Sequence, residues 1–127
     1  AISGNTEVYV FDMVDAMAAG DKNKAFRMLH DLLDAGENEY KLLALLCSQL
    51  ETIVEAKELA AAGKTPDAIR AFLGIHEFRV RKALQHGEGR SLERLRSTLA
   101  TAFGIDRAIK TGQMEARLAL ELLIAEA

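Results

Sequence analysis

The sequence predicts an all-α protein, a compact orthogonal or antiparallel bundle of about six to seven helices. Three observations carry this prediction. Ala, Leu, Glu, Lys and Arg dominate the 127 residues, whereas proline occurs once and tryptophan not at all, a composition typical of helices. β-Branched residues are sparse, and no stretch alternates apolar with polar residues over the length of a strand. Capping residues and glycines also recur at intervals of one helix length.

Three helices are expected in the first half of the chain, each opened by a capping residue. They cover about 7–19 after a cap at Asn5 or Thr6, a segment from the Asp21 cap to Gly36, and about 39–62 after Asn38. Apolar side chains recur every three or four residues, which places them on one stripe of each helix. These are Val10, Met13, Val14, Met17; Ala25, Phe26, Leu29, Leu32, Leu33; and Leu42, Leu46, Leu50, Ile53, Val54.

Four more helices are expected after Gly63. Thr65 followed by Pro66 predicts a cap and a first helical residue, and this short helix ends at Leu73-Gly74. The others are expected over about 76–86, from the Ser91 cap to about Thr111, and over about 114–126 beyond Gly112. Inward-facing positions are Phe78, Val80, Ala83, Leu84; and Leu92, Leu95, Leu99, Ala102, Phe103, Ile109. Because the loops are short, sequential helices are expected to pack antiparallel or at steep angles.

Length and composition indicate one helical domain over residues 6–127, with residues 1–5 interpreted as a linker or cloning remnant. Half of the residues are apolar and 28% are charged, the balance of a folded globule. The lone cysteine, Cys47, excludes an intramolecular disulfide. No run approaches the roughly 20 apolar residues that span a bilayer. We therefore expect a cytoplasmic protein that makes no membrane contact.

Charge is unevenly distributed along the chain. Residues 1–62 hold five basic and eleven acidic side chains, whereas residues 70–96 hold seven basic and three acidic ones. Within the basic stretch, residues 65–86 match a helix-turn-helix outline, in which the second helix enters the DNA major groove. Arg79, Arg81 and Lys82 are the candidate DNA-facing side chains. Arg70 counts against this alternative, because a small residue is usual at that position, and so does the acidic chain as a whole.

No residue pattern indicates catalysis, a cofactor or a metal. His30, His76 and His86 lack a carboxylate or cysteine at the spacing of a helical metal site, so surface or capping roles are expected. The Gly87–Arg90 segment follows no strand and is interpreted as a turn, and Cys47 as a small buried apolar residue.

Two features of the sixth helix are expected to be structural. Asp106 falls on its apolar stripe, and Lys110 follows four residues later, which predicts a local ion pair. Gly104 inside the same helix costs about 1 kcal/mol relative to alanine. A close helix crossing or a bend would account for it.

The final helix is apolar around nearly its whole circumference. Its apolar residues are Leu118, Ala119, Leu120, Leu122, Leu123, Ile124 and Ala125. A helix of this kind must be covered on all sides, and a small domain has difficulty covering every flank. The sequence therefore predicts that a partner protein packs here, with Leu118, Leu122 and Leu123 as anchors. A central core helix is the alternative.

Several segments, taken in order, resemble one protein family. They are Val10–Ala16, Lys24-Ala25 with Leu29, Leu32 and Leu33, Leu42–Leu46, Leu73–His76 with Phe78–Val80, and Asp106 with Ile109–Gly112 before a leucine-rich end. This series resembles the C-terminal domain of the delta subunit of bacterial DNA polymerase III, a clamp-loader component. The resemblance covers nearly everything from about Thr6 to Leu123.

The resemblance implies a role in subunit assembly. In this family the C-terminal helical domain joins its counterparts on the other clamp-loader subunits to form a collar, while other subunits hydrolyse ATP. It implies no catalytic residue in this chain, since the polymerase activity of the holoenzyme belongs to another subunit. The collar role and DNA contact are compatible with each other. In the assembled ring, the basic segment could face primer-template DNA that passes nearby.

Overall fold

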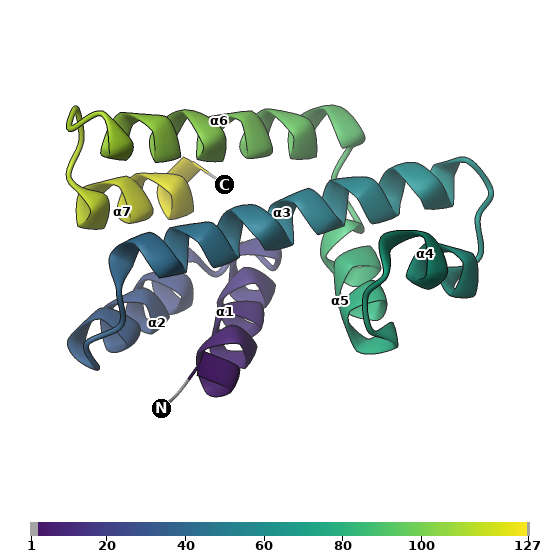
Figure 1. Ribbon diagram of the computed structural model, residues 1–127, viewed down its shortest axis with the longest axis horizontal. Helices are drawn as coiled ribbons and strands as arrows, with labels where there is room; N and C mark the ends of the chain where they lie inside the picture. The colour runs from purple at the N-terminus through teal and green to yellow at the C-terminus, as the bar shows by residue number, and fades with distance from the viewer. Residues whose placement is uncertain (1–2, 127) are drawn as a thin grey trace.

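Seven helices and no strand make up residues 3–126, the part of the chain that the computed structural model describes (Figure 1). The helices are α1 (Ser3–Ala18), α2 (Lys22–Asp34), α3 (Glu39–Ala61), α4 (Pro66–Leu73), α5 (Glu77–Gly87), α6 (Leu92–Lys110) and α7 (Ala116–Glu126). The predicted all-α class is therefore confirmed.

Helix starts follow the capping residues that the sequence indicates. Four of the predicted caps accept a backbone N–H: Asp21 from Lys24, Asn38 from Tyr40 and Lys41, Thr65 from Ala68, and Ser91 from Arg94. His76 caps α5 in the same way, since its ring Nδ1 accepts the N–H of Phe78 at 3.1 Å. At the end of α3, Gly63 takes a φ of +88°, which side-chain-bearing residues rarely adopt. Local signals of this kind fix most of the helix boundaries.

The start of α1 is the exception. The helix begins at Ser3, so Asn5 and Thr6 lie inside it and the predicted cap at either residue is wrong. Thr6 is 2% exposed, and its hydroxyl donates to Glu37 Oε1 at 2.8 Å. It ties α1 to the loop between α2 and α3. Residues 3–5, expected as part of a linker, are helical, and residues 1–2 lie outside the described part.

The long helix α3 organises the molecule. It packs against α1, α4, α5, α6 and α7. In Figure 1, α6 and α7 lie on one side of α3, α1 and α2 lie on the other, and α4 with α5 sits at its carboxyl end. The two helices that end the chain therefore form one outer edge of the fold, far in sequence from the helices they cover.

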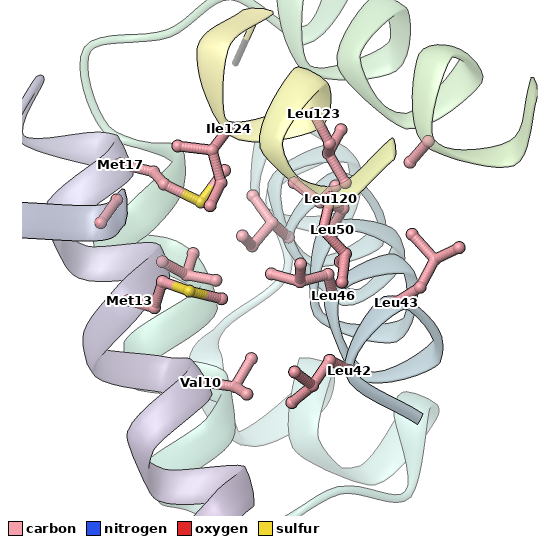
Figure 2. Packing of buried hydrophobic residues seen from close by; sticks show 14 of the residues in the cluster. Val10, Met13, Met17, Leu42, Leu43, Leu46, Leu50, Leu120, Leu123 and Ile124 are labelled. Carbon is pink, nitrogen blue, oxygen red and sulfur yellow. The ribbon is translucent and has the colours of Figure 1, made fainter. Parts of the chain in front are cut away.

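The core lies where α1, α3 and α7 meet (Figure 2). Fully buried residues include Val10 and Met13 from α1, Leu42 and Leu46 from α3, and Leu120, Leu123 and Ile124 from α7. Burying one such side chain stabilises the fold by about 1.5–3 kcal/mol. The apolar stripes predicted for the first and third helices are all buried. α7 therefore belongs to the core on one of its faces.

Lys57 joins α3 to the turn after α5. Its ammonium donates to the carbonyl of Gly87 at 2.6 Å and also to the carbonyl of Arg90. The guanidinium of Arg90 in turn donates to the carbonyl of Met17 at 3.0 Å. A cation at a helix carboxyl end satisfies carbonyls that have no partner within the helix. The segment Gly87–Arg90 is thus a braced turn that links α1, α3 and α5, as expected for a turn rather than a phosphate loop.

Candidate subunit interface

α7 has one buried and one exposed apolar face. The buried face consists of Ala116, Ala119, Leu120, Leu123 and Ile124. Leu118 and Leu122 are 50% and 36% exposed, and their spacing of four residues places them on one face, a turn apart. Leu123 is 0% exposed, so its prediction as a surface anchor is wrong. It packs inside the fold because it lies about 100° around the helix from Leu122.

Two contacts from α2 hold α7 in place. His30 Nε2 lies 3.0 Å from Glu121 Oε2, and the ammonium of Lys22 donates to the carbonyl of Ala125. Lys22 therefore sits at the carboxyl end of α7, where a cation is favourable. α6 packs along α7 as well. Because other helices fix α7 in this way, its exposed leucines are held in one arrangement, and a surface that is fixed in advance would lose less conformational entropy on binding a partner.

The outward side of α6 departs from the predicted pattern. Phe103, expected to face inward, is 47% exposed, whereas Ile105 is buried. Gly104 is also exposed, and a Cβ built on it would meet no atom within 4 Å. A close crossing by another helix of this fold therefore does not account for the glycine.

Lys110 Nζ and Asp106 Oδ2 lie 2.8 Å apart. They form the local ion pair that the sequence predicts, and a pair of this spacing stabilises a helix by about 0.2–0.5 kcal/mol.

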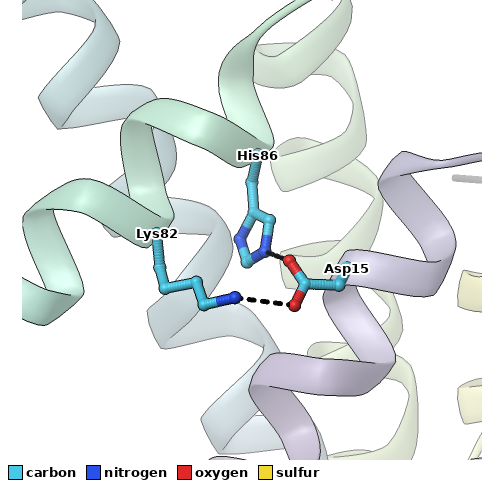
Figure 3. A network of polar contacts seen from close by, with 3 residues as sticks. All are labelled: Asp15, Lys82 and His86. Carbon is cyan, nitrogen blue, oxygen red and sulfur yellow. Dashed lines mark hydrogen bonds and ion pairs between the residues drawn. The ribbon is translucent and has the colours of Figure 1, made fainter.

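The face of α5 predicted to meet DNA is occupied by the fold itself (Figure 3). Lys82 Nζ donates to Asp15 Oδ2 on α1 at 2.9 Å, and His86 Nε2 is hydrogen-bonded to Asp15 Oδ1. His86 is only 4% exposed, and the Nε atom of Arg79 is buried too. Of the three candidate DNA-facing residues, Arg81 alone is exposed. Residues 65–86 therefore form a structural corner, and the DNA-binding alternative gains no support.

Asp15 links α1 to α5 through charge. Burial alone would raise the pKa of this carboxyl group, but the hydrogen bonds from Lys82 and His86 and the charges of both residues outweigh that effect. The pKa of Asp15 therefore lies below its ordinary value. The contact joins residues about 70 positions apart, which local periodicity cannot reveal. No sequence pattern singled out Asp15.

The thiol of Cys47 is not activated by its surroundings. Burial raises the pKa of the half-buried Cys47 thiol to about 11, and the nearby charge of Asp106 adds to the effect. The thiol is therefore protonated at neutral pH and is a poor nucleophile. Among the residues that the structure describes, no three His, Cys, Asp or Glu side chains are placed to hold a metal ion. Within the same range, no helix is long and apolar enough to cross a membrane.

The arrangement of helices around α3 defines a known class of domain, that of clamp-loader subunits. A solved structure, the DNA clamp loader delta protein of Bacillus subtilis, superposes on this chain with a TM-score of 0.90 at 27% identity. The match covers 95% of this chain and 36% of that one.

Sequence comparison gives the particular family. Residues 7–127 match the family model of the DNA polymerase III delta subunit, C-terminal domain, and the chain belongs to this family. DNA polymerase III subunit delta of Bacillus subtilis (strain 168) is 26% identical over 125 residues, which are 98% of this chain and 36% of that protein. The chain thus spans about a third of the length of these relatives, and the resemblance noted in its sequence is confirmed.

Proposed function

We propose that the chain is the subunit-assembly domain of a DNA polymerase III clamp-loader delta subunit. In this role it joins the other clamp-loader subunits in a collar and so supports loading of the sliding clamp during replication. Membership of the delta-subunit family supports a role in loading the sliding clamp during replication. The exposed leucines on the fixed helix α7 support the mode of action. The domain acts by holding subunits in a fixed order, while other subunits hydrolyse ATP.

The single observation that carries the proposal is the exposed face of α7. About half of Leu118 and a third of Leu122 are open to solvent. Full burial of a leucine is worth about 1.5–3 kcal/mol, so covering what is open on both is worth about 1–3 kcal/mol. A charge placed on this face would have to be desolvated in the assembly, which is strongly unfavourable. In the isolated chain the same charge would keep access to water through the third of the side chain at position 122 that is exposed.

Substitution of Leu122 by aspartate tests the proposal. The Leu122→Asp variant should keep its helical circular dichroism spectrum but lose co-purification with the other clamp-loader subunits of its organism. Phe72→Asp is the matched control, because Phe72 is 76% exposed on α4, at the other end of the fold. Phe72→Asp should assemble as the unmodified chain does. If Leu122→Asp assembles normally as well, α7 does not provide the interface.

A further inference from the structure

A second exposed face, on α6, carries a distinct set of side chains. Arg96, Ala100, Phe103, Gly104 and Arg107, here called the α6 outer face, are all exposed. Arg96, Ala100, Phe103 and Arg107 follow one another at intervals of four, three and four residues, the spacing of a seam between packed helices. α6 packs beside α7, and Figure 1 shows it along the outer edge of the molecule.

Phe103 is the apolar centre of this face. It leaves 47% of its surface in water, although it is an aromatic residue in a helix whose opposite side is buried. Arg107 follows Phe103 by one turn, is exposed and belongs to none of the ion pairs of the described residues. Arg96 lies two turns before Phe103. Its Nη2 atom is 2.6 Å from Glu58 Oε2, and both side chains are about half exposed. Aromatic residues and arginine are both enriched at protein–protein interfaces relative to the rest of the surface.

Gly104 supplies an independent argument. Glycine within a helix is unfavourable relative to alanine, and no neighbouring atom of this fold requires it, because an added Cβ would meet no atom within 4 Å. The missing side chain instead leaves the backbone of α6 open to close approach from outside. Another helix could reach the backbone beside Phe103 only if that position stays small.

The charges of α6 indicate the chemistry of that other helix. The α6 outer face holds two arginines and no acidic residue. Arg96 shares its charge with Glu58 of α3, whereas Arg107 is in no ion pair of the described residues, and Lys110 and Asp106 pair with each other. We propose that the α6 outer face binds an acidic helix of a neighbouring clamp-loader subunit, with a small residue of that helix against Gly104 and carboxylates beside Arg96 and Arg107. This inference rests on the proposed function and adds a second contact to α7. The leucines of α7 alone fall well short of the roughly 800 Å² per partner that a stable interface buries.

Placing a side chain at position 104 distinguishes an effect on binding to a partner from an effect on the stability of the chain. Gly104→Ala should raise the melting temperature of the isolated chain by about 3–5 °C, because alanine favours the helix. Gly104→Gln should fold at least as well as the unmodified chain, since its side chain extends into solvent. Both variants should bind the other purified clamp-loader subunits more weakly, Gly104→Gln by at least about tenfold. A variant that folds better and binds worse points to an external contact.

Reversing a charge tests the acidic partner. Arg107→Glu should weaken binding at least about tenfold at 50 mM salt, and this loss should shrink at 500 mM because salt screens the repulsion. Arg27→Glu is the matched control. Arg27 is also an exposed arginine, but it lies on α2, so its substitution changes the charge of the chain by the same amount away from the α6 outer face. It should bind like the unmodified chain. Binding is measured by biolayer interferometry with the immobilised chain.

The outcomes distinguish this inference from the proposed function. If the unmodified chain binds the loader subunits while the Gly104 and Arg107 variants bind equally well, the α6 contact is overturned and the assembly role stands. If the unmodified chain fails to bind them, both are overturned. Self-association of the chain that Gly104→Gln abolishes would assign the face to a second copy. Binding of a short DNA duplex that Arg107→Glu abolishes would assign it to nucleic acid, and either result overturns the acidic-helix partner.

Discussion

Truncating two leucines of α7 to alanine should separate its two faces. Leu123 is 0% exposed and Leu118 is 50% exposed, yet they lie on one short helix and have the same chemistry. Leu123→Ala leaves a cavity between α7 and the rest of the core, and such truncations cost about 2–5 kcal/mol. Leu118→Ala removes a partly solvated side chain and gains helix propensity, so its cost should stay below about 1 kcal/mol.

Urea denaturation of the isolated chain, followed by circular dichroism at 222 nm, measures both effects. Leu123→Ala should lower the denaturation midpoint strongly without changing the slope, and Leu118→Ala should hardly move it. In a binding assay with the other clamp-loader subunits, Leu118→Ala should bind more weakly despite its intact fold. Equal destabilisation by the two substitutions would refute the division of α7 into a core face and an open face.

Three further predictions concern the polar groups. Asp15→Asn should destabilise the chain by about 1–3 kcal/mol at pH 7, because it removes the charged partner of Lys82 and His86. Since the pKa of Asp15 is lowered from 3.8, its stabilisation is present above that pH and is lost as the pH falls through the folded-state pKa; an unchanged acid-denaturation curve in Asp15→Asn would contradict this. Alkylation of Cys47 should be slow at pH 8 and rise about tenfold per pH unit toward 11, whereas a rate that levels off near pH 9 would indicate an ordinary thiol. Thr65→Ala removes the cap of α4 and should cost about 1 kcal/mol in thermal unfolding; no loss would mean that tertiary packing alone fixes the helix start.

Much of the fold was predictable because its signals are local. Caps such as Asp21 and Ser91 act on the next turn of backbone, so their sequence position fixes the start of a helix. The same reasoning failed at Thr6, where a polar residue that resembles a cap is buried and bonded to Glu37. Whether such a side chain caps a helix or forms a buried hydrogen bond depends on tertiary contacts, which the local sequence does not show.

It was harder to predict which apolar residues lie at the surface. The spacing of apolar residues shows which side of a helix faces the core, but it does not show how wide the buried stripe is. Phe103 follows the buried residue Ala102, but it points outward. Arg96 and Arg107 lie on the same side of the helix, and their spacing from Phe103 was a signal that could have placed it at the surface. In α7 the polar side is narrow, because Arg117 and Glu121 mark it, one turn apart. Leu123 lies farther around the helix from Glu121 than Leu122 does, and this was a signal that could have assigned Leu123 to the core. The contact between Asp15 and His86 had no local signal at all.

Solvent access at Leu118, measured in the free chain and in the assembly, shows whether another clamp-loader subunit covers the exposed face of α7. A Leu118→Cys substitution in a Cys47→Ala background allows the rate of maleimide labelling to be measured in both states, with Phe72→Cys in the same background as the reference site. An interface at this face predicts rapid labelling of residue 118 in the free chain and strong protection once the other clamp-loader subunits are bound, with residue 72 reactive throughout. Equal labelling of residue 118 in the free and assembled states would contradict it.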